Sequence, residues 1–161
     1  MKAQPSPLKC LSYFITELVL TANPNHNPAN QVSLDFADLM ITSTTEELRD
    51  NNPKSRNWRV ALKIVQNISD EKKNCPYNFA VSLLGTFVVH PEYPENKVEQ
   101  LAKINGSSIL YSSARQMLWD VMGNGPFRPL MFPTISFVDD PDDSHGVLVE
   151  ESKPEPGTID K

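Results

Sequence analysis

The stretch from Asn105 to Phe137 constrains the chain most, because it joins one strong helix to a sharp stop and an apolar segment interrupted by prolines. Ser107 or Ser108 is placed to begin the helix, since a serine hydroxyl accepts a hydrogen bond from an unpaired backbone N–H of the first turn. The run Gly123-Asn-Gly-Pro126 ends it, because glycine suits a helix C-cap and proline cannot continue a helix.

The predicted helix is apolar around most of its circumference. One stripe at helical spacing consists of Leu110, Ala114, Met117, Leu118 and Val121. Further apolar residues outside this stripe are Ile109, Tyr111, Trp119 and Met122. A helix with so few polar positions must be buried on more than one side.

Four strands are predicted ahead of this helix. The first spans residues 10–22, and the second spans residues 32–44 and begins with Val32, Leu34 and Phe36 on one face. The third runs from Trp58 to Val65 with strict alternation, and the fourth covers residues 77–89, where Gly85 indicates a bulge or a close backbone approach. Residues 45–56 are charged and contain a proline, which favours a loop.

This order of elements predicts an α+β fold. Consecutive strands on short links form an antiparallel meander, and the helices that follow cover one face of the four-stranded sheet. The long helix is preceded by a short one within Glu95–Ile104. We expect one domain over residues 1–138, followed by a solvated acidic tail over residues 139–161.

Composition excludes several classes of function. The net charge is −5 and no basic stripe is present, which argues against a nucleic-acid partner. The best early apolar run, Cys10 to Leu20, is shorter and more polar than a membrane span, so we expect neither insertion nor a signal peptide. Cys10 and Cys75 form no metal or disulfide pattern, which favours reduced thiols in the cytoplasm.

Motifs for catalysis, metals or cofactors are not found. The histidines His26, His90 and His145 are scattered, and no phosphate-binding loop or nucleophile elbow occurs. Arg115 has two interpretations: it anchors an anion, or it pairs with a carboxylate across a packed interface. We therefore expect a protein that is not an enzyme and carries neither metal nor cofactor.

The predicted elements leave too much apolar surface for one small domain. The strands are partly apolar on both faces, and the helix is apolar nearly all round. Isolated chains seldom leave contiguous apolar patches larger than a few hundred Å². Another subunit must cover the helix, or a groove must stay open for a ligand, or both.

A family resemblance is carried by the last third of the chain. Ile109-Leu110-Tyr111 followed by Ala114-Arg115, then Gly125-x-Phe127, and then Leu130, Pro133 and Phe137, resemble the C-terminal signature of the SecB protein-export chaperones. Val32–Asp38 is similar to the second strand of that family, and Val81–Phe87 is similar to its fourth. The similarity spans residues 10–137.

The resemblance implies a homotetramer, a dimer of dimers, that holds unfolded or nascent polypeptides without ATP. The positions that match the client groove of the family are Val32, Leu34, Phe36, Tyr77, Phe79 and Val81, for which a place in the sheet core is an equal alternative. The expected subunit interface consists of Leu110, Tyr111, Arg115, Met117, Leu118 and Trp119.

Departures from the family pattern bear on its role in export. Glu17 matches one acidic residue that docks the motor ATPase SecA in that family, but Thr21 and Ala80 stand where further acids are expected. This difference argues against SecA as a partner and against general export. The alternative is a dedicated chaperone of a single client, such as the antitoxin of a toxin–antitoxin pair.

Overall fold

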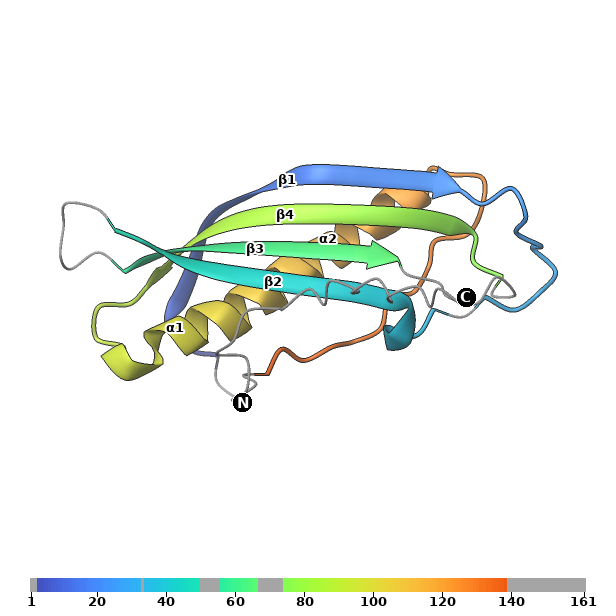
Figure 1. Ribbon diagram of the computed structural model, residues 1–161. Helices are drawn as coiled ribbons and strands as arrows, with labels where there is room; N and C mark the ends of the chain where they lie inside the picture. The colour runs from blue at the N-terminus through green and yellow to red at the C-terminus, as the bar shows by residue number, and fades with distance from the viewer. Residues whose placement is uncertain (1–2, 33, 50–55, 67–73, 139–161) are drawn as a thin grey trace, which may run out of the picture.

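A four-stranded antiparallel sheet packs on one long helical rod in the computed structural model, which describes residues 3–32, 34–49, 56–66 and 74–138 (Figure 1). The strands are β1 (Leu8–Ala22), β2 (Leu39–Leu48), β3 (Asn57–Gln66) and β4 (Tyr77–Val89). The helical segments are η1 (Phe36–Asp38), η2 (Glu95–Lys97), α1 (Val98–Leu101), the π-helical turn η3 (Ala102–Gly106) and α2 (Ser107–Met122).

The sheet has the strand order β1-β4-β3-β2, with every neighbouring pair antiparallel. Strands β2, β3 and β4 form the predicted meander. The prediction was wrong for β1, which pairs with β4 instead of β2. The inner face of β4 is buried along its whole length, whereas the outward positions of β2 between Met40 and Leu48 are polar. Apolar strands are stable in the interior of a sheet, and a polar strand suits an edge.

The predicted second strand begins too early. Val32 and Leu34 lie in irregular chain, and Phe36 begins η1. The Asp35 N–H donates to Asp38 Oδ2 at 2.9 Å, and the Asp38 N–H donates to Asp35 O at 3.1 Å. Aspartate side chains compete in this way with a strand ladder for backbone groups. The strand starts at Leu39 and continues to Leu48, into the region predicted to be a loop.

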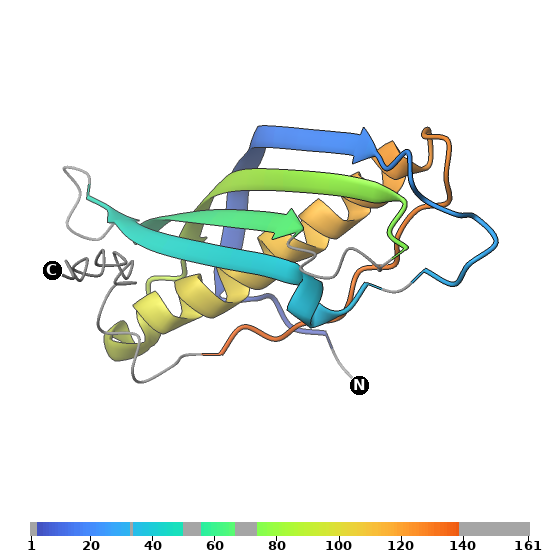
Figure 2. The same ribbon diagram turned by 45° about the vertical axis from the view of Figure 1, so that its right-hand side comes forward.

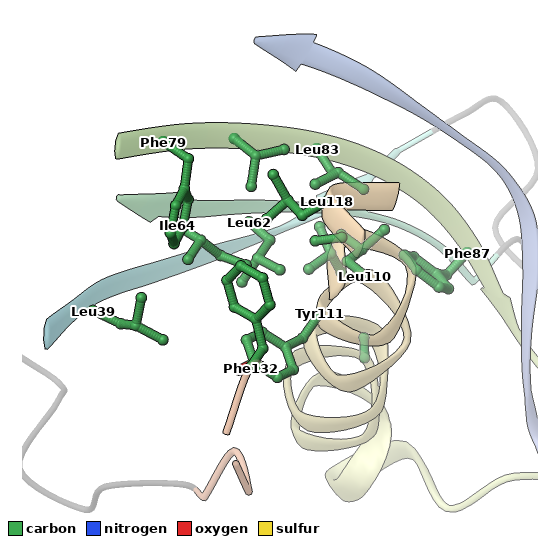
Figure 3. Packing of buried hydrophobic residues seen from close by; sticks show 14 of the residues in the cluster. Leu39, Leu62, Ile64, Phe79, Leu83, Phe87, Leu110, Tyr111, Leu118 and Phe132 are labelled. Carbon is green, nitrogen blue, oxygen red and sulfur yellow. The ribbon is translucent and has the colours of Figure 1, made fainter. Parts of the chain in front are cut away.

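The hydrophobic core lies between the inner faces of β3 and β4 and one side of α2 (Figure 3). Trp58, Val60, Leu62 and Ile64 alternate inward along β3, as predicted. Gly85 allows a close approach: a Cβ atom there would lie 2.6 Å from Phe87 Cε2. The pairing of β1 with β4 is regular at Gly85; its two register shifts lie in β1, between Cys10 and Ser12 and between Ile15 and Glu17.

The prediction that a serine cap begins the long helix was wrong. Residues 95–122 are helical without a break, and Gly106 has the right-handed helical conformation with φ −61° and ψ −47°. Ser108 Oγ donates back to Ile104 O at 2.8 Å. A Cβ atom on Gly106 would lie 2.8 Å from Val60 Cγ2, so glycine lets the rod pack closely against β3. The helix ends before Gly123, as predicted.

The C-terminal segment, residues 126–138, returns along the side of the rod (Figures 1 and 2). Leu130 and Phe132 are buried, and the Phe132 ring meets the Phe79 ring edge-on at 5.1 Å between centroids. The Tyr111 hydroxyl donates to Pro133 O at 2.8 Å. The segment therefore completes the core beside α2, and the predicted tail (residues 139–161) lies outside the described residues.

Candidate functional site

Strand β1 presents a long apolar surface, which we call the β1 apolar face. Its exposed side chains, each 39% to 52% accessible, are Leu11, Tyr13, Phe14, Ile15, Leu18 and Val19. The cross-strand partners of Tyr13, Ile15 and Leu18 on β4 are all buried. Helix α2 lies mainly under β3 and β4 and leaves this part of the inner face uncovered.

Both sides of β1 are apolar because apolar residues occupy consecutive positions of the strand, and consecutive residues point to opposite faces. Phe14 and Val19 therefore lie on the outer face and Tyr13 and Ile15 on the inner one, while the shift between Ile15 and Glu17 puts Leu18 on the same face as Ile15. β1 is also an edge strand of 15 residues. A long, apolar edge strand is a template for pairing with another chain.

Two open grooves run along the exposed side of α2. The first, called the helix–β1 groove, is lined by Tyr13, Met117 and Val121 among others and has a volume of about 510 Å³. The second, called the C-terminal groove, has a volume of about 390 Å³. Its lining consists of Ser112, Arg115, Gln116 and Trp119 from α2 and of Leu130, Met131 and Phe132 from the returning segment.

Arg115 is the charged residue of the C-terminal groove. Its guanidinium carbon lies 5.8 Å from the centroid of the Tyr111 ring, within range of a cation–π contact. Burial raises the pKa of the Tyr111 hydroxyl, and the positive charge of Arg115 opposes this shift. Trp119 is 41% exposed and Met131 is 70% exposed, so the groove combines one cation with accessible apolar surface.

The predicted client-binding residues do not form one surface. Tyr77, Phe79 and Val81 are 1%, 4% and 0% exposed and belong to the core, as the alternative interpretation had it. Leu34 packs against the edge of the core. Phe36 is 60% exposed, and it begins η1, which lies beside the C-terminal segment in both ribbon views. Val32 is also exposed.

The predicted subunit interface is divided between two environments. Leu110, Tyr111 and Leu118 are buried within the chain itself (Figure 3). Arg115 and Met117 are half-buried, and Trp119 is exposed. Met117 packs against the core with part of its side chain, and the accessible parts of Arg115, Met117 and Trp119 remain available to another subunit or to a ligand.

Glu17 lies on the outer face of the sheet and is already paired. Ser82 Oγ donates to Glu17 Oε2 at 3.0 Å, and Lys63 Nζ is 3.3 Å from the same oxygen. The hydrogen bond from Ser82 and the charge of Lys63 lower the pKa of the Glu17 carboxyl. Glu17 is therefore no isolated negative charge.

Sequence reasoning missed the β1 apolar face as a site, although it recognised the excess of apolar surface. The signal was the run from Cys10 to Leu20, in which Leu11, Phe14 and Val19 occupy positions where a half-exposed strand carries polar residues. In the described part of the chain, no group of three or more His, Cys, Asp or Glu side chains could hold a metal ion. No helix among those residues is long and apolar enough to cross a membrane.

Comparison with known families identifies the chain. Residues 12–139 match the family described as preprotein translocase subunit SecB. The chain belongs to the SecB family. The resemblance seen in the sequence is thereby confirmed, and so is the chaperone class to which this family belongs. A comparison with curated proteins finds no significant match.

Two solved structures are similar to this chain at low sequence identity. A protein of unknown function from Streptococcus agalactiae is 14% identical, with a TM-score of 0.51 over 80% of this chain and 97% of its own. The SecB-like chaperone Rv1957 of Mycobacterium tuberculosis, solved with a ChAD peptide from the antitoxin HigA1, is 17% identical. Its TM-score is 0.47 over 82% of this chain and 93% of its own. The four-stranded antiparallel sheet followed by a long helix is thus shared with the Streptococcus agalactiae protein, and the family match over residues 12–139 makes it the fold of a SecB-family member.

Proposed function

We propose that this SecB-family protein is an ATP-independent holdase that binds unfolded or nascent polypeptides on its exposed apolar surfaces. The observation that carries the proposal is the concentration of accessible large apolar side chains beside α2, on β1 and in the C-terminal groove. Contiguous apolar surface of this kind marks interaction sites. Shallow apolar contacts combined with backbone hydrogen bonds allow one surface to hold many sequences.

We assign the two grooves different roles. The β1 apolar face and the helix–β1 groove suit assembly into the expected homotetramer, because pairing through β1 would cover both an open edge and its apolar side chains. The C-terminal groove suits clients, and so does the exposed Phe36 of η1, the element that lies beside the C-terminal segment. Met117 belongs to the first surface, whereas Arg115 and Trp119 belong to the second.

Suppression of aggregation tests the client surface. The double variant Phe36→Asp with Met131→Asp places two charges on exposed apolar positions and should abolish ATP-independent protection of a denatured model protein. Thr134→Asp is the matched control, since it adds charge at an exposed position of the same segment without removing apolar surface. Full protection by a folded double variant would contradict the assignment.

Solution mass tests the assembly surface separately. The chain has a mass of 18.1 kDa, so a tetramer has roughly four times this value. Leu18→Asp with Tyr13→Asp should reduce the assembly to a smaller species, because charged residues on an edge strand oppose pairing. An unchanged mass in this variant would exclude β1 from the interface, and a monomeric wild type would refute the tetramer.

A dedicated client remains a second candidate function, favoured by the environment of Glu17. Its carboxylate is neutralised by Lys63, and the outer face next to it carries the exposed apolar residues Phe14 and Val19. This surface differs from the acidic one expected to dock SecA. Affinity capture from the source cell should then return one dominant client and no SecA, whereas recovery of SecA with many exported proteins would favour general export.

A further inference from the structure

Two polar atoms at one end of the sheet are buried without a partner. Trp58 Nε1, in a residue that is 8% exposed, and Thr45 Oγ1 make no hydrogen bond to any described residue. Both lie on the inner face, where Trp58 is paired across the strands with Glu47, and Thr45 with Val60. An indole N–H only donates, and a threonine hydroxyl can donate as well. A buried donor without an acceptor costs free energy, so a group outside the described residues should accept from both.

The C-terminal segment lies on the side of α2 that faces β2. Ser107 Oγ is 2.6 Å from Ser43 Oγ of β2, and Tyr111 follows one turn later on the same side of the helix. Figure 3 shows Tyr111 and Phe132 on the side of the helix towards Leu39 of β2. The segment is therefore next to β2 along this part of the rod.

This segment runs from the end of α2 back towards its beginning. Pro133 O accepts from the Tyr111 hydroxyl, and the Phe137 ring then lies 6.2 Å from the Tyr111 ring, measured between centroids. In both ribbon views the segment is directed towards α1 (Figures 1 and 2). The described chain stops at Val138, so η3 is the next part of the rod in this direction.

The acidic run that follows in the sequence has the length needed to reach both atoms. Gly106 of η3 packs on Val60, and Trp58 is the next inward residue of β3. From Tyr111 back to η3 the rod extends about 10 Å, because an α-helix rises about 1.5 Å per residue. An extended chain covers this distance in about three residues. The first residues after Val138 are Asp139, Asp140, Pro141, Asp142 and Asp143.

We propose that this acidic run, residues 139–143, continues along the rod and supplies a carboxylate that accepts hydrogen bonds from Trp58 Nε1 and Thr45 Oγ1. A carboxylate has two acceptor oxygens, so one aspartate can serve both donors. The contact would fix the far end of the C-terminal segment, whose start is already held by Tyr77 at Phe127. The inference concerns a contact within the chain and does not rest on the holdase function.

The charges around this position allow a carboxylate to be bound. Lys103 of η3 is half-buried, about one turn before Ser107, and contributes a positive charge to this part of the rod. Glu47, the acidic residue opposite Trp58, has Arg49 Nε 3.5 Å from its Oε2, which partly offsets its repulsion. A carboxylate that is close to a lysine and bound by two donors costs much less to bury than an isolated one.

The indole N–H signals in a proton–nitrogen NMR spectrum of the full chain test the proposal. The chain has 2 tryptophans, so the spectrum contains Trp58 and, as an internal reference, the 41% exposed Trp119. Trp119→Phe assigns the two signals. In a variant of the acidic run, the Trp58 N–H should exchange with solvent about ten-fold faster, because a hydrogen bond to a charged group is lost, while the Trp119 signal stays unchanged. The variant carries Asp139→Ala, Asp140→Ala, Asp142→Ala and Asp143→Ala.

A matched control and a second measurement accompany this variant. Trp58→Phe removes the donor, so in that background the variant of the acidic run should lower the urea midpoint less than it does in the wild type. The control removes the same amount of charge further along the tail and should leave the exchange rate of the Trp58 N–H unchanged. It carries Glu150→Ala, Glu151→Ala, Glu155→Ala and Asp160→Ala.

Each contrary outcome overturns the inference. Fast exchange of the Trp58 N–H in the wild type would show that it has no acceptor. Equal rates in the wild type and the variant of the acidic run, or strictly additive effects on the urea midpoint, would place the acceptor elsewhere. If unlabelled wild-type chains mixed with the labelled variant restore slow exchange, the acceptor belongs to a second copy and not to the same chain. The holdase function stands in every case, because suppression of aggregation tests it separately.

Discussion

Removal of the Tyr77 hydroxyl should destabilise the fold without weakening client binding. The hydroxyl donates to Phe127 O at 2.7 Å and accepts from the Phe127 N–H at 3.0 Å, with Met122 O as a further acceptor at 3.2 Å. These bonds join the start of β4 to the end of α2 and to the turn behind it. Tyr77 itself is buried, so Tyr77→Phe changes no exposed surface.

The magnitude follows from the bonds lost. Each hydrogen bond contributes about 0.5–1.5 kcal/mol net, and a buried backbone group left without a partner costs about 1–3 kcal/mol. Tyr77→Phe should thus lower the free energy of unfolding by about 2–3 kcal/mol. For a domain of this size, the expected decrease in the melting temperature is roughly 5–10 °C.

Urea unfolding at fixed protein concentration is the appropriate assay, because assembly would make the apparent stability depend on concentration. Tyr13→Phe is the matched control: it removes the same atom from an exposed position and should change the free energy of unfolding by less than about 0.5 kcal/mol. Equal midpoints for the two variants would refute the role assigned to the Tyr77 hydroxyl.

A second substitution tests the same contact through coupling. A Cβ atom on Gly125 would lie 2.5 Å from Tyr77 Oη, so Gly125→Ala must displace the hydroxyl or the turn. In the Tyr77→Phe background that clash is absent, and Gly125→Ala should cost less than in the wild type. Strictly additive effects would show that the two residues are not in contact.

Two other predictions concern the core and the outer face. Phe132→Ala should lower the free energy of unfolding by about 3–5 kcal/mol, while Met131→Ala, at an exposed position next to it, should have little effect; denaturant titration compares them. NMR titration should find the pKa of Glu17 below the ordinary glutamate value, and Ser82→Ala or Lys63→Met should raise it. Because the pKa is lowered in the folded state, the stabilisation by this pair is present above the ordinary value and is lost as the pH falls through the lowered one.

Much of the architecture could be predicted from local patterns. The predicted alternation from Trp58 to Ile64 is correct at every residue, because every second side chain of a central strand is buried and the sequence must be apolar at those positions. The end of the helix at Gly123 is correct in position, although Gly123 keeps the right-handed conformation with φ −60° and ψ −21°, so the stop depends on the local Gly and Pro residues and not on a left-handed cap. The excess of apolar residues on the helix and the strands also implied a surface for a partner.

Properties that depend on distant neighbours could not be read in this way. Alternation shows that β4 has two faces, but only the position of α2 decides that Tyr77, Phe79 and Val81 point into the core. The serines at the expected helix start gave the wrong boundary, since Gly106 packs on Val60 and lets the helix run through. Asp35 and Asp38 close a turn that an alternating pattern did not reveal.

The sequence by itself determined the family, the inner strands, the long helix and its stop, because these depend on residues near one another in the chain. The tertiary structure decided which apolar residues are core and which remain exposed. Helix α2 packs mainly on β3 and β4, and this leaves Tyr13, Ile15 and Leu18 of the 15-residue β1 uncovered. The position of the helix on the sheet depends on contacts between residues far apart in the sequence, and it determines which apolar surface is available for binding.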